Sequence, residues 1–193
     1  MFSLTVDDEL VLAFPDEDSL EEGYSLIMAN YDHIWPWSQW LEEDFSLDKV
    51  REFYRRNVQK FESGDQIHLR IMFKGKIAGG IDLFEINSHH RSAEIGYWLS
   101  KDHTGRGIVI RSVTRLLEHA FDELKLNRIV IKCMPENLKS RAIPEKLGFV
   151  VEGIERQGGW MHTRFVDHVV YSLLADEWRQ TLKNREPASK YIR

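Results

Sequence analysis

The chain has one cysteine, five prolines and no long apolar run, and these scarcities exclude whole classes of protein. A single cysteine, Cys133, cannot form a disulfide within the chain, so a disulfide-stabilised fold is excluded. No apolar run approaches the roughly 18 residues that a membrane helix requires. The first residues lack the basic and apolar segments of a signal peptide. We therefore expect a cytoplasmic protein that is neither exported nor inserted in a membrane.

Positive charge is also in deficit, with 26 Lys and Arg against 31 Asp and Glu and a net charge of −5. This balance argues against a nucleic-acid-binding surface and accommodates a cationic partner more easily. Acidic residues gather between residues 7 and 22 and again at 42–44. They are either solvated helix starts or a source of long-range attraction for a positively charged substrate. The eight histidines form no recognised ligand pattern, so we expect no metal.

Length and composition suit a single domain, because 193 residues with 42% hydrophobic and 30% charged residues can bury a substantial core. We assign residues 1–182 to this domain. Residues 183–193, which include Pro187 and several charges, are expected to form a loosely held C-terminal tail. Cys133 lies in an apolar segment and is expected to be a core residue rather than a nucleophile.

Hydrophobic periodicity predicts a mixed α/β fold. Strands are expected at residues 10–14, 67–73, 77–86, 93–99, 128–133, 149–155 and 168–174, and helices after Asp18, Ser46, Gly107 and Asn137. Short turns join the strands between residues 67 and 99 into an antiparallel meander. The helix after Gly107 is a crossover, so the next strand is expected to lie parallel to the preceding one. The fold class is therefore α/β, a single mixed sheet of six to seven strands flanked by helices.

The most informative segment is a glycine loop, Gly105-Arg106-Gly107, between a strand and a helix. The helix carries an apolar stripe of period 3.6 with the members Val109, Val113, Leu116, Leu117, Ala120 and Leu124. Its opposite face is expected to carry Arg111, Ser112, Arg115, Glu118 and Asp122. Unpaired N–H groups and the positive end of the helix dipole then face a phosphate or pyrophosphate. The alternative is a tight turn without a ligand.

Two better-known phosphate loops do not fit this segment. The P-loop pattern G-x-x-x-x-G-K-[ST] is absent from the chain. The dinucleotide fingerprint needs a third glycine where Ile110 stands. The loop therefore indicates an anion site of another kind.

A family resemblance that covers nearly the full chain suggests the ligand. The element order, the loop at residues 103–108 and the run from Asn137 to Phe149 resemble the GNAT acyltransferase superfamily. The strand at 93–98, the Trp-Pro-Trp segment at 35–37 and the Asn-x-x-Ser helix start are most similar to one branch. This is the RimJ/RimL-like branch of ribosomal-protein N-terminal acetyltransferases.

The resemblance implies an acetyl-CoA-dependent N-acetyltransferase that transfers the acetyl group directly, in a ternary complex, to a primary amine. A protein N-terminal α-amine is the expected acceptor. Two alternatives stay open: an acetyltransferase for a small amine such as a polyamine, amino acid or antibiotic, and a non-catalytic acyl-CoA-binding module. A homodimer also stays open.

The resemblance also implies how acetyl-CoA is held. Its pyrophosphate is expected to bind the backbone of Gly105, Arg106, Gly107, Ile108 and Val109. The strand with Tyr97, Trp98 and Leu99 is expected to splay from its neighbour and to pair with the pantetheine arm, since unpaired backbone groups are costly. Asn137 is expected to add an amide contact to the same arm.

For the acid, many superfamily members use a tyrosine just before the Glu-Lys/Arg-x-Gly-Phe segment, but Pro144 occupies that position. The branch resemblance offers the Ser140 hydroxyl instead, which could protonate the CoA thiolate near a helix start. Pro144 has no N–H for the carbonyl of Ser140, so we expect that oxygen to be free. The alternative is that the Ser140 side chain bonds only to the backbone.

For the base, Glu94 is the candidate, because it matches a glutamate that serves as base in some superfamily members. A surface or ion-paired glutamate is the alternative interpretation. The glutamate that the branch places near the later hairpin has no counterpart, since Gly158 and Gly159 occupy that region.

The acceptor is expected to bind among aromatic side chains between the first two helices, with one tryptophan opposite. The predicted acceptor-binding residues are Tyr31, Asp32, Trp35, Trp37 and Trp160. Aromatic faces and a carboxylate suit a cationic amine. The alternative is a minor core beneath the loop.

Overall fold

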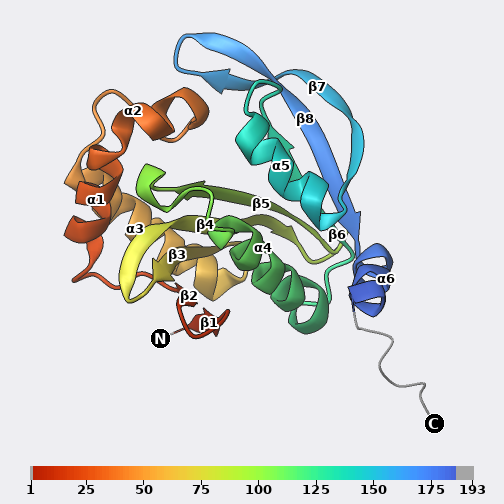
Figure 1. Cartoon of the computed structure of the whole chain (residues 1–193). Coiled ribbons are helices and arrows are strands. Elements are labelled where there is room, and N and C mark those ends of the chain that lie inside the picture. The colour runs from red at the N-terminus through yellow and green to blue at the C-terminus, as the bar shows by residue number, and fades with distance from the viewer. Residues whose placement is uncertain (1, 186–193) are drawn as a thin grey trace.

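A mixed sheet of eight strands forms the centre of the computed structural model, which describes residues 2–185 (Figure 1). The strands are β1 Ser3–Thr5, β2 Leu10–Ala13, β3 Ile67–Phe73, β4 Lys76–Asn87, β5 Ser92–Leu99, β6 Arg128–Cys133, β7 Val150–Met161 and β8 Arg164–Leu174. Their order across the sheet is β1-β2-β3-β4-β5-β6-β8-β7. Only β5 and β6 are parallel within this described sheet, which confirms the predicted crossover.

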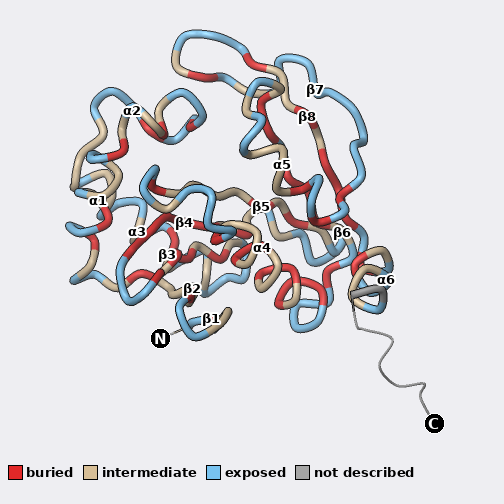
Figure 2. Tube along the Cα trace, in the orientation of Figure 1, coloured by how far each residue is buried: buried red, intermediate tan, exposed pale blue. Residues whose placement is uncertain are grey.

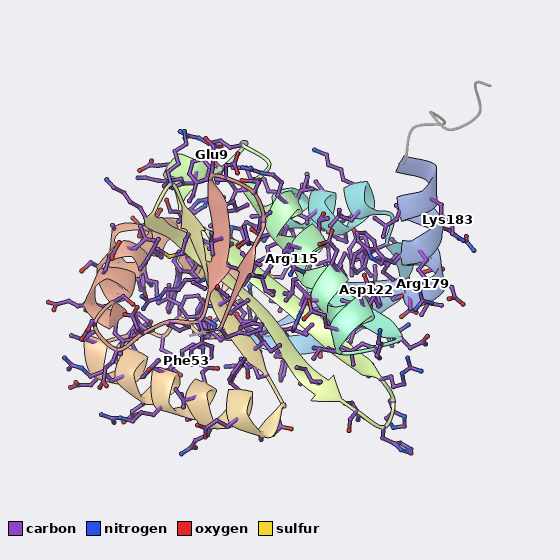
Figure 3. The ribbon with its side chains drawn as sticks, turned by 90° about the horizontal axis from the view of Figure 1, so that it is seen from below. Glu9, Phe53, Arg115, Asp122, Arg179 and Lys183 are labelled. Atoms are coloured by element: carbon purple, nitrogen blue, oxygen red, sulfur yellow. The ribbon has the colours of Figure 1, made fainter. Side chains whose placement is uncertain are left out.

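Helices cover both faces of the sheet (Figures 1 and 3). The helical segments are α1 Leu20–Ala29, α2 Tyr31–Ile34, η1 Trp35–Trp37, α3 Leu47–Ser63, η2 Lys101–His103, α4 Ile108–Glu118, η3 His119–Glu123, α5 Leu138–Leu147 and α6 Ala175–Arg185. Helices α1 and α3 pack on β3 and β4 from one side. Helix α4 packs on the other side across β1, β2, β4 and β5, next to α5.

The sheet has more strands than the six to seven expected, because β1 is only three residues long. Three residues are too few for a periodicity signal, but Leu4 of β1 pairs with Leu12 of β2 and both are buried. The burial of these two side chains adds the extra strand to the edge of the sheet.

The last two strands are longer than predicted. The segment around Gly158 and Gly159, expected to be a loop, belongs to β7. Its pairing with β8 shifts register between Val151 and Gly153 and again between Glu155 and Gly159. The glycines therefore form part of a bulge, which lets the hairpin continue where the sequence suggests a turn. Strand β7 is the outer edge of the sheet and is exposed along most of its length (Figure 2).

Three predicted helix caps are confirmed. The Ser46 hydroxyl accepts a hydrogen bond from Lys49 N, Gly107 precedes α4, and the Asn137 side chain accepts from Ser140 N. The expected cap at Asp18 is wrong, since α1 begins at Leu20 with Ser19 in the cap position. The Asp16 carboxylate instead accepts a hydrogen bond from Ser19 N at 2.8 Å. A turn over residues 16–19 therefore leads into the helix.

Two members of the expected α4 pattern are placed wrongly. Ser112 is fully buried, because it lies in line with Ile108 and Leu116 on a broad buried face of the helix. Leu124 is 38% exposed rather than core. The helix widens into the π-turn η3 before Leu124, and the extra residue in that turn rotates Leu124 away from the 3.6-residue stripe.

The C-terminal helix α6 is held to the core by Trp178, which is fully buried with its ring 6.4 Å from that of Phe121. The expected domain boundary after residue 182 falls inside this helix. Residues 186–193 of the expected tail lie outside the described residues. Within residues 2–185, no helix combines the length and apolar character needed to cross a membrane.

The Trp178→Ala variant should lose about 3–5 kcal/mol of unfolding free energy, because it removes a large aromatic side chain from a packed site. Arg179→Ala is the matched control, since its ion pair with Asp176 is exposed and should contribute less than about 1 kcal/mol. Urea denaturation of both variants measures the difference. Equal stability losses would contradict the anchoring role of Trp178.

Candidate active site

The site begins where β5 and β6 stop pairing. Only Ser92, Ala93 and Glu94 of β5 pair with β6, opposite Arg128, Ile129 and Val130. From Ile95 onward, β5 remains bonded to β4 while its other edge has no strand partner. The backbone N–H and C=O groups on that edge are available to a ligand that runs along it. The splay expected for this strand is therefore present.

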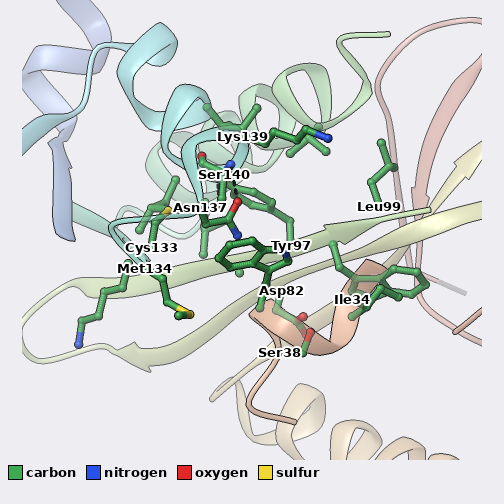
Figure 4. Close-up of a pocket in the computed structure, with 18 of the residues that line it drawn as sticks. Ile34, Ser38, Asp82, Tyr97, Leu99, Cys133, Met134, Asn137, Lys139 and Ser140 are labelled. Atoms are coloured by element: carbon green, nitrogen blue, oxygen red, sulfur yellow. Dashed lines mark hydrogen bonds between the residues drawn. The ribbon is translucent and has the colours of Figure 1, made fainter. Parts of the chain in front are cut away.

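A cleft of about 920 Å³ opens at this separation. It brings together most of the predicted CoA-binding residues: Tyr97, Trp98, Leu99, Gly105, Gly107, Ile108, Val109 and Asn137. The side chain of Arg106 is exposed and is not part of the lining. Figure 4 shows the central part of the cleft, with Tyr97 below Asn137 and Ser140.

The end of the cleft next to α4 is built by backbone geometry. Gly105 and Gly107 have φ values of +78° and +70°, a region that favours glycine. No atom lies within 4 Å of a Cβ added to either residue, so conformation and not crowding requires glycine. The first hydrogen bond of α4 joins Arg111 N to Gly107 O, which leaves the N–H groups of the preceding turn without a helical partner. This arrangement fits a pyrophosphate.

The opposite end holds a cluster of three side chains around Ser140. The Tyr97 hydroxyl donates a hydrogen bond to Ser140 O at 2.9 Å, and Ser140 Oγ donates to the Tyr97 oxygen at 3.3 Å. The Cys133 sulfur lies 3.2 Å from Ser140 Oγ. Asn137 Oδ1 is occupied by Ser140 N at 3.1 Å, so only its amide N–H groups remain for a ligand.

Pro144 accounts for the hydrogen bond between the Tyr97 hydroxyl and Ser140 O, and this bond corrects one expectation. The oxygen of Ser140 is not free, because the Tyr97 hydroxyl takes the place of the N–H that proline lacks. Burial raises the pKa of Tyr97 well above its usual range, so the hydroxyl remains a donor. Burial also raises the pKa of the Cys133 thiol, which fits its expected core role. The sequence did not indicate this contact, which joins residues 43 positions apart.

Glu94 lines the cleft as expected, but its carboxylate is engaged. Glu94 Oε1 lies 3.1 Å from Lys132 Nζ, and Glu155 Oε2 lies 3.3 Å from the same nitrogen. Burial opposes the charge of Lys132, yet the two carboxylates outweigh it and raise its pKa. The structure thus contains the ion pair that was the alternative interpretation of Glu94. Its role as base stays a prediction.

Among the predicted acceptor residues, Trp37 lines the cleft, next to Trp40. Tyr31, Asp32, Trp35 and Trp160 do not line it. Tyr31 stacks on Trp35, which in turn stacks on His162 of the β7–β8 turn with ring centroids 3.5 Å apart. His162 Nε2 also donates to the Trp35 carbonyl at 2.9 Å. Trp35 therefore connects the segment after α2 to the β7–β8 turn.

Trp160 lies on the hairpin, 54% exposed, with its ring against that of Phe165. Several polar cleft residues were missed by the sequence reasoning: Gln39, Asp82, Lys132 and His168. Asp82, Lys132 and His168 lie in strands without a motif and reach the cleft through the sheet register, whereas Gln39 lies in the loop after η1. Among residues 2–185, no group of three His, Cys, Asp or Glu side chains could hold a metal ion.

A second cavity of about 630 Å³ adjoins the cleft between the sheet and helices α1 and α3. The two spaces share the side chains of Trp40, Asp82, Phe84 and Trp98. The Asp82 carboxylate lies 2.5 Å from His68 Nδ1. The cleft therefore continues into a second space on the side of α1 and α3.

Comparison with known proteins agrees with this geometry. The family model described as an acetyltransferase (GNAT) domain matches residues 9–150. YdaF of Bacillus subtilis is 34% identical over 182 residues, which cover 92% of this chain and 98% of YdaF. A ribosomal-protein-serine acetyltransferase of Escherichia coli is 27% identical and covers 90% of this chain and 97% of its own length. A spermidine N(1)-acetyltransferase of Vibrio cholerae is 30% identical, and the match covers 67% of this chain and 75% of that protein.

Solved structures show the same fold. The crystal structure of the microcin self-immunity acetyltransferase MccE, in complex with acetyl-CoA and AMP, has a TM-score of 0.83 and 28% identity to this chain. The match covers 88% of this chain and 94% of MccE.

The Pro144→Ala variant should weaken turnover of acetyl-CoA severalfold while the Kd of CoA stays unchanged. Alanine supplies an N–H to Ser140 O, which then competes with the Tyr97 hydroxyl and loosens its hold on Ser140 Oγ. Steady-state kinetics and calorimetry measure the two effects.

The same substitution in a Tyr97→Phe background provides the control. Because the competing hydroxyl is then absent, Pro144→Ala should have little further effect. The same decrease in both backgrounds would contradict this account.

Proposed function

The chain belongs to the acetyltransferase (GNAT) family, and on that premise we propose that it acetylates the α-amine of a protein N-terminus. As a member of this family it is an acetyl-CoA-dependent transferase, so the alternative of a non-catalytic acyl-CoA-binding module is set aside. The cytoplasmic location expected from the sequence is part of the proposal. The relative named a ribosomal-protein-serine acetyltransferase supports a protein acceptor.

The donor half of the reaction follows from the separation of β5 and β6. The pantetheine arm would bond to the free edge of β5, with the pyrophosphate at the start of α4. This direction of binding places the thioester near Tyr97 and Ser140. The Ser140 hydroxyl, held by Tyr97, then donates its proton to the sulfur as the C–S bond breaks.

The observation that favours an α-amine is the ion pair between Glu94 and Lys132. A carboxylate bonded to a lysine is a poor proton acceptor, so the acceptor amine must lose its proton easily. Near neutral pH this costs about 1 kcal/mol for an α-amine, but roughly 4 kcal/mol for a lysine-like or polyamine nitrogen. An α-amine therefore suits this cleft better.

A small amine is the second candidate. The relative named a spermidine N(1)-acetyltransferase supports it, as do the carboxylates of Asp82 and Glu94 in the cleft lining. The aromatic faces of Trp37 and Trp40 would suit either cationic acceptor.

A screen of CoA release with N-terminal peptides, spermidine, amino acids and aminoglycosides tests the proposal. Peptides should give the highest kcat/KM, and Ser140→Ala should lower it about 10²-fold or more with every acceptor. Glu94→Gln should change kcat/KM little with either acceptor, because the carboxylate is bonded to Lys132 and is not free to take a proton. Turnover with spermidine alone would overturn the α-amine assignment.

The proposal includes a homodimer formed through the outer edge of β7. This strand has twelve residues and exposes Val150, Val151 and Ile154, which is an edge that soluble proteins usually cover. Sedimentation equilibrium should give twice the chain mass for the wild type and the monomer mass for Ile154→Lys. A monomeric wild type at micromolar concentration would contradict the pairing.

A further inference from the structure

One polar group in the cleft has no part in the donor half of the reaction. His168 of β8 lines the cleft, and its side chain is only 13% exposed. Its Nδ1 is buried without a hydrogen-bond partner and lies 3.8 Å from Glu155 Oε2. Because Nδ1 faces this carboxylate, Nε2 is the nitrogen that remains for a ligand in the cleft.

We propose that His168 is the base that takes a proton from the acceptor amine and that Glu155 is its positioning residue. The proposal rests on acetyl transfer to an amine but not on which amine is the acceptor. Glu155 would fix the orientation of the imidazole, because the group that faces Nδ1 determines which nitrogen is left for the acceptor amine.

The sheet register places His168 on the acceptor side. Val169 pairs with Cys133, and the Cys133 side chain faces Ser140. Since neighbouring residues in a strand point to opposite faces, His168 faces away from Ser140, on the face that carries Lys132. A thioester lying in the gap between β5 and β6 would then have Ser140 on one side and His168 on the other.

The charged groups near His168 come from three strands of the same sheet. Glu155 of β7, Lys132 of β6 and Glu94 of β5 form a linked set with two carboxylates and one ammonium. Gln39, which lies close to the same site, is uncharged. A protonated imidazole would bring the set to electrical neutrality, whereas protonating Glu94 would break its ion pair with Lys132.

The glycines of the β7 bulge make the space for this pair. A Cβ at Gly159 would lie 2.7 Å from His168 Cε1 and would also collide with Gln39. A Cβ at Gly158 would lie 2.5 Å from Glu155 Cγ. Glycines at these two positions therefore leave the space that the side chains of Glu155 and His168 occupy.

The proton balance is complete with these groups. The acceptor enters as an ammonium, and His168 Nε2 removes one proton and later releases it to solvent. The free amine attacks the thioester carbon, so that a C–N bond forms and the C–S bond breaks. The thiolate takes the Ser140 proton, and Ser140 regains the second proton that the nitrogen loses on becoming an amide.

The test measures kcat/KM against pH for two acceptors that differ in amine pKa. A limb of this pH profile that has the same midpoint with both acceptors reports a group on the enzyme. His168→Gln should remove that limb and lower kcat about 10²-fold or more. The Kd of acetyl-CoA should not change. Free imidazole should restore part of the activity of His168→Ala. Glu155→Gln should shift the enzyme limb and lower kcat by about tenfold, with folding checked by thermal denaturation.

His90→Ala is the matched control, because His90 lies exposed in the turn between β4 and β5. It should keep the wild-type profile. A wild-type pH limb in His168→Gln, or no rescue by imidazole, would overturn the proposal. These measurements use whichever amine turns over best, so failure of the α-amine assignment remains a separate outcome.

Discussion

The hydrogen bonding between β5 and β6 stops after three residue pairs, and the chemistry on both faces of the sheet depends on that interruption. If pairing continued to Leu99, the backbone edge would be satisfied within the protein and no ligand could use it. The interruption is stable because the other edge of β5 stays bonded to β4 and the other edge of β6 to β8. Each strand thus keeps one bonded edge and leaves its other edge beside the gap free for a ligand.

The two sides of this gap carry different kinds of groups. On the side of α4 and α5 lie backbone N–H groups, a helix start and the hydroxyls of Tyr97 and Ser140, which suit a phosphate and a leaving thiolate. On the side of α1 and α3 lie carboxylates, imidazoles and indoles, which suit a cationic amine. With the roles proposed above, the sheet would separate the donor chemistry from the acceptor chemistry, and the two would meet at the gap.

The residues expected to bind acetyl-CoA could be predicted from the sequence, because local backbone and side-chain preferences place them. Gly107 and Asn137 begin helices because of their own backbone and side-chain preferences, and the β5–β6 crossover follows from connection length. The contacts of the residues expected to bind the acceptor could not be predicted in the same way. Trp35 was expected to bind the acceptor, but its ring stacks on His162, which lies 127 residues later. Tyr97 likewise meets Ser140 only through the tertiary fold, and no spacing rule connects them.

The stacking of Trp35 on His162 has a consequence for the order in which the molecule is assembled. The glycine turn before α4 and the Asn137 cap of α5 form from contacts between residues only a few positions apart. Closing the β7–β8 turn on the segment after α2 requires a contact across 127 residues, and such distant contacts form late in folding because loop closure costs entropy. A refolding chain would therefore order the turn that fits a pyrophosphate before it stacks Trp35 on His162.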